Sequence, residues 1–447
     1  MYFPLELIQG GIKTMQLYAK RTFALDTENA FKIGPLIAKQ ETQGHSIIRL
    51  NLGEPDFNVP EFIKDEIKQQ LDKNNTHYCD PKGLYTLREA ISHQIYLSRR
   101  IQISPEQIVI FPGAKPAIGF CQQAYCDPGD EIIYPSPGFP IYESFIRYLN
   151  AIPVPIHLSE ENGFTFNIEQ FIERLNPKTK MIFLNFPSNP TGGIATLKQL
   201  EEIASLILEK CHPHVRIFSD EIYEHIIYEN QPHYSIASIP GMEKRTIICS
   251  GFSKSYAWTG GRIGYAVFPS VEEADVFKNL NINYFSCVPP YNQEGARVAL
   301  EHPDAANHIK KMVEIFEQRR DYVIQTLNQI PGINCQKPKG TFYAFPNIQE
   351  LCDNLNICEF YQKLPLPIQQ QTTPSTLFQM FALYYHNVAV LDRKSFGKTG
   401  SEGEHFIRIS YASDLPILKQ GLSHLKNAAK DVDGFKKFIN TSDLYFQ

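Results

Sequence analysis

Short apolar runs alternate with amphipathic stretches from about residue 60 to about residue 300. One amphipathic stretch, Leu197–Leu208, carries four apolar residues on a single helical face: Leu200, Ile203, Ala204 and Ile207. This alternation is typical of a mostly parallel sheet that helices cover on both faces. The pattern predicts strands at Ile108–Ile110, Glu131–Tyr134, Met181–Leu184, Val215–Phe218, Thr246–Cys249 and Gly264–Phe268.

The pattern changes in the last third of the chain. Apolar residues at helical spacing predict a long helix that ends near Pro331-Gly332 and includes Ile309, Met312, Val313 and Phe316. Strands are expected next at Thr341–Phe345, Asn387–Leu391 and His405–Ser410, followed by a closing helix at Asp414–Ala429. These elements predict a second, smaller α+β domain.

We expect the large α/β domain at residues 61–303 and the small domain at 304–433, with the N-terminal segment 1–60 contributing to the small domain and 434–447 forming a tail. The stretch Lys363–Thr376, with three prolines and three consecutive glutamines, reads as a surface insertion. Asp443–Gln447 resembles a cut protease recognition site left by cloning, and we expect it to lie outside the fold.

Composition narrows the class of protein. Of 447 residues, 43% are hydrophobic, enough for a full core, so wholesale disorder is excluded. The net charge of −5 does not favour nucleic acid or an anionic membrane as a partner, and no stretch approaches the roughly 18 apolar residues of a membrane span. The nine cysteines form no CxxC motif, so we expect neither a structural metal nor disulfides. Because Met1–Gly11 lacks the features of a secretory signal, a cytoplasmic location is expected.

Candidate chemistry lies at the ends of the predicted strands, where ligands bind in open parallel sheets. Lys254 comes directly after a strand, among small and hydroxyl residues, and Arg262 offers a planar cation for a phosphate. Asp220 ends an apolar strand, where an acid needs a partner such as a protonated ring nitrogen. Lys254 and Arg262 read equally well as charges of a surface loop, and Asp220 as a helix cap.

Two turns add to this set. Prolines and glycines stiffen the turn that holds Asn189, and Gly113-Ala114 opens a predicted helix whose free N–H groups favour an anion. An ordinary turn explains either segment alone. Taken together, however, the residues match the needs of pyridoxal phosphate: an amine for its aldehyde, an acid for its ring nitrogen and an anchor for its phosphate.

At this point a family resemblance is evident. The chain resembles the class I and II aminotransferases, pyridoxal-phosphate enzymes of fold type I, and in particular the branch that contains many bacterial aspartate aminotransferases. The resemblance runs from about Ile47 to Ala429 and rests on motifs in the family's order. The motifs are Asn51–Phe57, Tyr78–Gly83, Asp127–Glu131, Asn189–Gly192, Ser219–Tyr223, Ser253-Lys254, Arg262–Tyr265 and Arg408–Ala412. The family's large domain has a mostly parallel sheet of the seven-stranded type sandwiched by helices, and a smaller α+β domain accompanies it.

The resemblance also implies roles for single residues. Lys254 carries the cofactor and moves the substrate's Cα proton, while Asp220 keeps the pyridine nitrogen protonated. Tyr223 and Asn189 bind the phenolic oxygen, and Phe139 and Ile222 cover the two faces of the ring. The phosphate is held by Gly113, Ala114, Lys115, Ser253 and Arg262, with Tyr78 reaching it from the partner of a homodimer with shared sites. The substrate's α-carboxylate is clamped by Arg408, helped by Asn189 and the backbone of Gly53.

The expected activity is therefore ping-pong transfer of an amino group from an L-amino acid to a 2-oxo acid such as 2-oxoglutarate. An aspartate-like donor is the first choice. Phe139 stands where aspartate-specific members usually have tryptophan, which keeps alanine and aromatic donors open, and Lys115 is a candidate for binding a distal carboxylate. A pyridoxal-phosphate C–S lyase or synthase is the alternative, since the same residues support elimination. A transcription regulator with a DNA-binding domain is not expected, because the segment before Gly53 is short and weakly basic.

Overall fold

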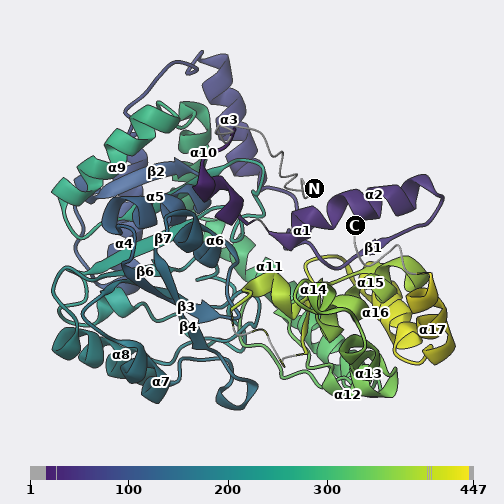
Figure 1. The fold of residues 1–447 in the computed structure, drawn as a ribbon. Helices are drawn as coiled ribbons and strands as arrows, with labels where there is room; N and C mark the ends of the chain where they lie inside the picture. Colours follow the sequence, from purple (N-terminus) through teal and green to yellow (C-terminus); the bar gives the residue numbers. More distant parts are fainter. Residues whose placement is uncertain (1–16, 27, 400, 402, 404, 442–447) are drawn as a thin grey trace.

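The computed structural model describes residues 17–441 apart from residues 27, 400, 402 and 404. Two expectations fall outside the described residues: that of a missing signal, which rests on Met1–Gly11, and that of a cloning remnant, which rests on Asp443–Gln447. Figure 1 shows a large part built around a sheet, beside a smaller part made mainly of the C-terminal helices. None of the described helices is both long and apolar enough to cross a membrane.

A seven-stranded sheet forms the centre of the larger part, in the order β2-β8-β7-β6-β5-β3-β4. β8 is antiparallel to both of its neighbours, and the other pairs are parallel. The strands are β2 (Ile108–Pro112), β3 (Glu131–Ser136), β4 (Ile152–His157), β5 (Thr179–Asn185), β6 (Arg216–Asp220), β7 (Thr246–Gly251) and β8 (Ile263–Val267). The predicted mostly parallel α/β sheet is confirmed.

Helices cover both faces of this sheet because successive strand residues point to opposite sides and both sides are apolar. In β5, Met181 and Phe183 pack with one apolar cluster, which includes residues of α5, α6 and α9, while Ile182 and Leu184 pack with another, which includes residues of α7 and α8. Helices α4 and α10 cover the second face over β2 and β8. The helices of this part are α3 (Glu61–Asp72), α4 (Tyr85–Arg99), α5 (Lys115–Tyr125), α6 (Ile141–Tyr148), α7 (Ile168–Arg174), α8 (Leu197–Lys210), α9 (Val271–Tyr284) and α10 (Pro290–Glu301).

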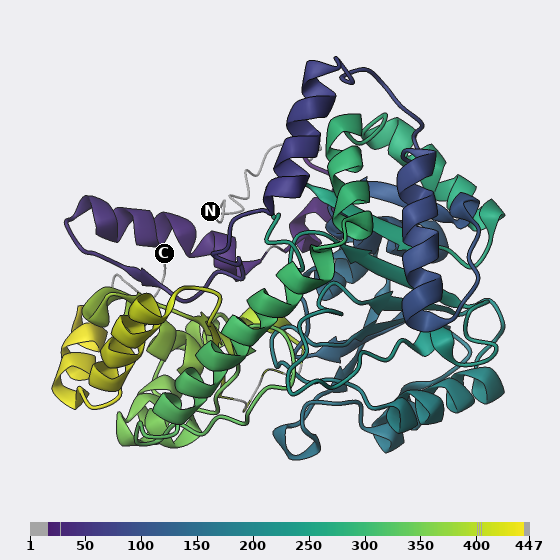
Figure 2. The same ribbon diagram turned by 180° about the vertical axis from the view of Figure 1, so that it is seen from behind.

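The smaller part has its own apolar cluster, and the long helix α11 (Ala305–Leu327) runs into it from the sheet part (Figure 2). The predicted long helix and closing helix are both present, the latter as α16 with Asp414 as its capping residue. The remaining elements are β9 (Tyr343–Ala344), α12 (Gln349–Asn354), α13 (Ile357–Gln362), α14 (Leu366–Gln369), α15 (Pro374–His386), β10 (Val388–Ala389), β11 (Leu391–Asp392), β12 (Ile407–Ser410), α16 (Leu415–Ala428) and α17 (Val432–Asn440).

The N-terminal segment contacts both parts of the molecule, because its beginning packs against α6 of the sheet part and its end pairs with a strand of the smaller part. It contains η1 (Lys20–Ala24), α1 (Asn29–Lys32), α2 (Gly34–Thr42) and β1 (Ile48–Arg49). β1 pairs in parallel with β10, and Ile48 and Leu50 belong to the apolar cluster of the C-terminal elements. Figure 1 shows α2 and β1 beside α15 and α16, far along the chain from their own neighbours in sequence.

The predicted surface insertion is only partly a surface segment. Lys363, Leu366 and Gln371 are exposed, and α14 forms within this stretch. Thr372 and Thr373 are buried, and Thr373 accepts a hydrogen bond from the backbone of Thr376 and caps α15. The prolines and glutamines therefore mark a surface turn, whereas the threonines that follow begin a core helix.

Candidate active site

A cavity of about 540 Å³ opens at the carboxyl edge of the seven-stranded sheet, where β5, β6 and β7 end and the C-terminal strands face them. Because β8 is antiparallel to its neighbours, Arg262 at its start reaches the same edge. Nearly all of the residues predicted for the site line this cavity: Gly53, Ala114, Lys115, Phe139, Asn189, Asp220, Tyr223, Ser253, Lys254, Arg262 and Arg408. The two exceptions are Gly113, which lies just behind the wall, and Tyr78.

Lys254 projects into the cavity from the turn that follows β7. Its Nζ donates a hydrogen bond of 2.6 Å to the carbonyl oxygen of Gly53 and lies 5.8 Å from the centre of the Phe342 ring. Burial lowers the pKa of Lys254 to about 8, and the positive charges of Arg408 and Lys115 act in the same direction. Because burial disfavours the charged amine, a large share of the neutral amine is available near physiological pH for attack on a carbonyl.

Asp220 ends β6 and is buried at the floor of the cavity. Tyr142, from α6, donates a hydrogen bond of 2.6 Å to its Oδ2. Burial raises the pKa of Asp220 to about 6, although the hydrogen bond from Tyr142 opposes this. No lysine or arginine among the described residues forms an ion pair with Asp220, so this carboxylate lacks a cationic partner inside the protein, as an acid that pairs with a ligand would.

Arg408, on β12, is held rigidly on the other side of the cavity. It donates hydrogen bonds of 2.9 Å to Asn189 Oδ1 and 2.6 Å to the Asn51 carbonyl oxygen. The guanidinium carbon lies 4.2 Å from the centre of the Tyr343 ring and 4.8 Å from that of Phe396. Its Nε is buried and has no hydrogen-bond partner. A fixed planar cation with a free N–H is suited to bind a carboxylate.

Two tyrosines connect Arg408 to the rest of the cavity. The hydroxyl groups of Tyr223 and Tyr343 lie 2.8 Å apart, and burial raises the pKa of both phenols. Gly53 approaches so closely that a Cβ there would lie 1.9 Å from the Tyr343 hydroxyl oxygen. A side chain at position 53 would therefore displace Tyr343 from the site.

An anion site lies at the start of α5. Gly113 has a φ of +87°, and a Cβ on it would lie 2.2 Å from Arg262 Nη2, so only glycine lets the guanidinium approach the turn. The Arg262 guanidinium donates a hydrogen bond of 2.8 Å to the Thr259 carbonyl oxygen and forms no ion pair with any described acid. The helix N-terminus at Ala114 and Lys115, the buried Ser253 and this unneutralised cation together provide a cradle for a phosphate.

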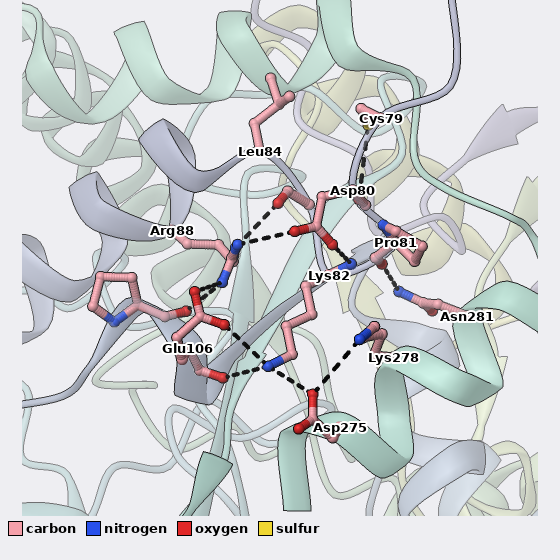
Figure 3. A network of polar contacts seen from close by, with 12 residues as sticks. Cys79, Asp80, Pro81, Lys82, Leu84, Arg88, Glu106, Asp275, Lys278 and Asn281 are labelled. Carbon is pink, nitrogen blue, oxygen red and sulfur yellow. Dashed lines mark hydrogen bonds and ion pairs between the residues drawn. The ribbon is translucent and has the colours of Figure 1, made fainter. Parts of the chain in front are cut away.

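Tyr78 lies outside the cavity, and 87% of its surface is exposed. The residues that follow it are fixed by a network of polar contacts (Figure 3). The buried Lys82 Nζ contacts Glu106 Oε2 at 3.2 Å and Asp275 Oδ1 at 2.9 Å, while Arg88 contacts Asp80 Oδ2 at 3.2 Å. An exposed aromatic side chain on a rigidly held segment is suited to contact a partner protein.

A buried cluster behind the cavity resembles a metal site, since ligand atoms of Glu221, Glu224 and His233 all lie within 4.8 Å of one another. Arg99 already satisfies it: Nη2 contacts Glu221 Oε2 and Glu224 Oε2 at 2.5 Å each. This cation holds the pKa of the Glu221 carboxyl far below its usual range. The cluster is therefore an ion-pair network at the end of β6, and we assign no metal to it.

Sequence reasoning missed several residues of the site. Asn185 Oδ1 accepts a hydrogen bond of 3.0 Å from the Asn189 backbone and fixes the turn, and Tyr142 and Tyr343 hold Asp220 and Tyr223. Glu28 forms an ion pair with Lys115 at the cavity mouth. Tyr142 lies three residues after Phe139, and this proximity was the only signal that could have found it. Glu28 and Tyr343 come from segments remote in sequence.

The side chains present fit pyridoxal phosphate. The buried amine with a lowered pKa suits its aldehyde, and the buried acid without a cation suits its ring nitrogen. The helix N-terminus with an unneutralised guanidinium suits its phosphate. The fold and this set of groups define a pyridoxal-phosphate enzyme of fold type I.

Comparison with known proteins gives the family. The model of the aminotransferase class I and II family matches residues 45–425, and the chain belongs to this family. Over 388 residues the chain is 35% identical to the aspartate aminotransferase of Pyrococcus abyssi and 33% identical to aromatic-amino-acid aminotransferase 2 of Thermococcus litoralis; each match covers 86% of this chain and 92% of the relative. The crystal structure of the aspartate aminotransferase from Rhizobium meliloti superposes with a TM-score of 0.83 at 30% identity, covering 93% of this chain and 99% of that one. The protein is therefore a pyridoxal-phosphate-dependent transaminase.

Proposed function

We propose that the enzyme moves the amino group of an L-amino acid with a distal carboxylate, aspartate first, to 2-oxoglutarate. The observation that carries the transfer of the amino group is the joint presence of Lys254, Asp220 and Arg408 in one cavity, whereas the choice of aspartate as first donor rests on the relatives. The name of one relative supports aspartate as the donor, and that of another supports aromatic amino acids. Phe139, which stands in place of a larger ring, also keeps aromatic donors as alternatives.

Substrate binding is assigned to Arg408. Its guanidinium is held between two rings and by Asn189, so it loses little freedom when it binds the α-carboxylate. Its free Nε offers a further hydrogen bond to a carboxylate oxygen. Binding the α-carboxylate here orients the amino acid so that its Cα faces Lys254 from within the same cavity.

Proton transfer is assigned to Lys254. Bound pyridoxal phosphate supplies an aldehyde that takes up the amino group and a ring that withdraws electrons from the substrate's Cα. Lys254 Nζ, neutral in a large fraction of molecules near pH 8, would take the proton from Cα and hold it for its return. In the cofactor-free protein this amine is held inside the cavity by its hydrogen bond of 2.6 Å to the Gly53 carbonyl oxygen.

The remaining groups hold the cofactor. Asp220 keeps the ring nitrogen protonated, and Tyr142 orients the carboxylate for this contact. Tyr223 and Asn189 would bind the phenolic oxygen, and Phe139 and Ile222 would cover the two ring faces, since all four side chains line the cavity. The phosphate is assigned to the residues of the cradle: the backbone of Gly113, Ala114 and Lys115, with Ser253 and Arg262.

We further propose a homodimer in which Tyr78 completes the partner's phosphate site. Its 87% exposure and the rigid segment that carries it support this assignment. Residues 61–303 are assigned to a large domain and 304–433 to a small one, because one apolar cluster lies entirely within the first range and another consists mostly of residues from the second. All nine cysteines are free, which supports a reducing compartment, and we place the enzyme in the cytoplasm.

The test is a half-reaction with single amino acids. Purified holoenzyme is mixed with aspartate, alanine, phenylalanine or cystathionine in the absence of an acceptor, and oxo acid and ammonia are measured separately. We expect aspartate to yield one equivalent of oxo acid per site without ammonia, and added 2-oxoglutarate to yield glutamate. Continuous ammonia release from cystathionine would instead identify the lyase, and no conversion of aspartate would overturn the proposed donor.

A further inference from the structure

An ion pair lies in the wall of the cavity. Lys115 Nζ and the carboxylate of Glu28 are in direct contact, and both residues line the cavity. The Glu28 side chain is 19% exposed and that of Lys115 is 43% exposed. Lys115 thus faces the cavity with its charge already matched by a carboxylate of this chain.

The surroundings of this pair are aromatic and apolar. Lys115 Nζ lies 5.8 Å from the centre of the Phe31 ring and 5.6 Å from that of Phe139, and Ile118 and Leu52 line the same cavity. With the ion pair formed, this end of the cavity presents rings and a neutral pair of charges rather than a free cation. Such a surface accepts an apolar or aromatic side chain without leaving a charge unpaired.

Glu28 is brought to the cavity by a segment that is anchored on both sides. The Asp26 backbone N–H donates a hydrogen bond of 2.9 Å to Ser144 Oγ on α6, and Asn29 Nδ2 donates one of 2.9 Å to Ser395 Oγ. Glu28 directly precedes the short helix α1, which lies between the two parts of the molecule (Figure 1). The contact with Lys115 is therefore built into the resting fold.

We propose that Glu28 determines substrate specificity by competing with the distal carboxylate of a substrate for Lys115. This inference rests on the proposed transaminase function. A dicarboxylic amino acid must displace Glu28 from Lys115, and separating this existing ion pair makes its net free energy of binding less favourable. An aromatic or aliphatic amino acid leaves the pair intact. The cavity therefore accepts both classes, and the charge on Glu28 shifts the balance toward neutral side chains.

The test compares Glu28→Gln with Asp26→Asn in the holoenzyme. Glutamine keeps the size of the side chain and removes its charge, while Asp26→Asn removes the same charge two residues away, from an acid paired with Lys32 and Lys398 rather than Lys115. Binding of two unreactive probes, maleate and 3-phenylpropionate, is measured by calorimetry. The ratio of kcat/KM for aspartate to that for phenylalanine is measured in parallel.

We expect Glu28→Gln to bind maleate about fivefold more tightly and to bind 3-phenylpropionate within about twofold of the wild type, since a partly exposed ion pair has a modest strength. The aspartate to phenylalanine ratio should rise by a similar factor, and Asp26→Asn should change neither value. A second variant, Lys115→Met, should weaken maleate binding and remove the effect of Glu28→Gln when the two are combined.

Unchanged maleate binding in Glu28→Gln would overturn the proposal, and so would an equal change for both probes. Failure of the proposed function gives a different result, because the wild-type enzyme would then convert neither aspartate nor phenylalanine. If the wild type transaminates both amino acids and Glu28→Gln has the same selectivity, only the role of Glu28 is wrong.

Discussion

Arg408 Nη1 and Asn189 Oδ1 lie 2.9 Å apart although 219 residues separate them in the chain. Their hydrogen bond joins β12 of the smaller part to the turn that follows β5 of the large sheet. Because Asn185 fixes that turn through a hydrogen bond of 3.0 Å to the Asn189 backbone, the anchor for the α-carboxylate is aligned with the sheet edge that carries Asp220. The position of a bound amino acid is thus set by both parts of the molecule.

Replacing Arg408 tests this anchor. Arg408→Gln removes the charge and should lower kcat/KM by about 10²–10³-fold for every donor and acceptor, because all of them carry an α-carboxylate. Arg408→Lys keeps the charge but loses the planar group, so its kcat/KM should lie between those of the wild type and Arg408→Gln. Steady-state kinetics with aspartate and 2-oxoglutarate measure the effect. A loss confined to one substrate would contradict the role given to Arg408.

Asp220 should destabilise the cofactor-free protein at neutral pH. Its pKa is raised from 3.8 to about 6, so the folded state binds more protons than the unfolded state between these values and stability falls as the pH rises through them. The cost approaches about 3 kcal/mol above pH 6. Asp220→Asn should therefore stabilise the apoprotein at pH 8 but not at pH 4, while it abolishes most activity.

Denaturant unfolding of the apoprotein at the two pH values measures this difference. Lys254→Ala is the control variant, because it alters the cavity and leaves the buried acid in place. An Asp220→Asn apoprotein that is equally or less stable than the wild type at pH 8 would show that Asp220 has a compensating partner that the present account lacks.

Cys358 should be the most reactive of the partly exposed thiols. The nearby Cys352 thiol and His405 favour its thiolate and lower the pKa of Cys358 to about 6. By contrast, burial raises the pKa of Cys79 to about 12. At pH 7.5 iodoacetamide should modify Cys358 well before Cys79, because the thiolate is the reacting form. Peptide mass spectrometry over a time course measures both rates, and equal rates would refute this prediction.

The shared site can be tested by mixing two impaired subunits. Tyr78→Ala weakens the phosphate site of the partner, and Lys254→Ala removes the amine of its own site. A hybrid dimer retains one site with both groups, so co-expression should restore about a quarter of wild-type turnover at limiting pyridoxal phosphate. Sedimentation velocity checks that dimers form. If the mixture is no more active than its parents, Tyr78 acts within its own subunit or not at all.

Much of the fold follows from local pattern. The strands with unbroken apolar runs, such as Met181–Leu184, were all found because both faces of the sheet are covered. β4 was missed because it contains Pro153 and Pro155, which remove backbone donors and normally argue against a strand; at the sheet edge they are tolerated. The antiparallel direction of β8 was not predicted, since nothing in a single strand's sequence records the direction of its neighbours.

The small domain was predicted less accurately. The expected strand Asn387–Leu391 is divided at Val390 into β10 and β11, which pair in different sheets. In the cavity, motif residues such as Lys254 and Asp220 were found because they stand at strand ends. Glu28 was not, because its role comes from a contact with a residue 87 positions away, which periodicity cannot reveal.

The central claim is that Lys254 carries the pyridoxal phosphate through which the amino group is transferred. The most direct measurement is borohydride reduction of the holoenzyme followed by peptide mass spectrometry, before and after addition of aspartate. We predict that the cofactor is found covalently on Lys254, that aspartate releases it from the protein chain with one equivalent of oxo acid, and that Lys254→Ala carries no label while the exposed Lys198→Ala is labelled normally. Label on another lysine, or label on Lys254 that no amino acid removes, would contradict the account.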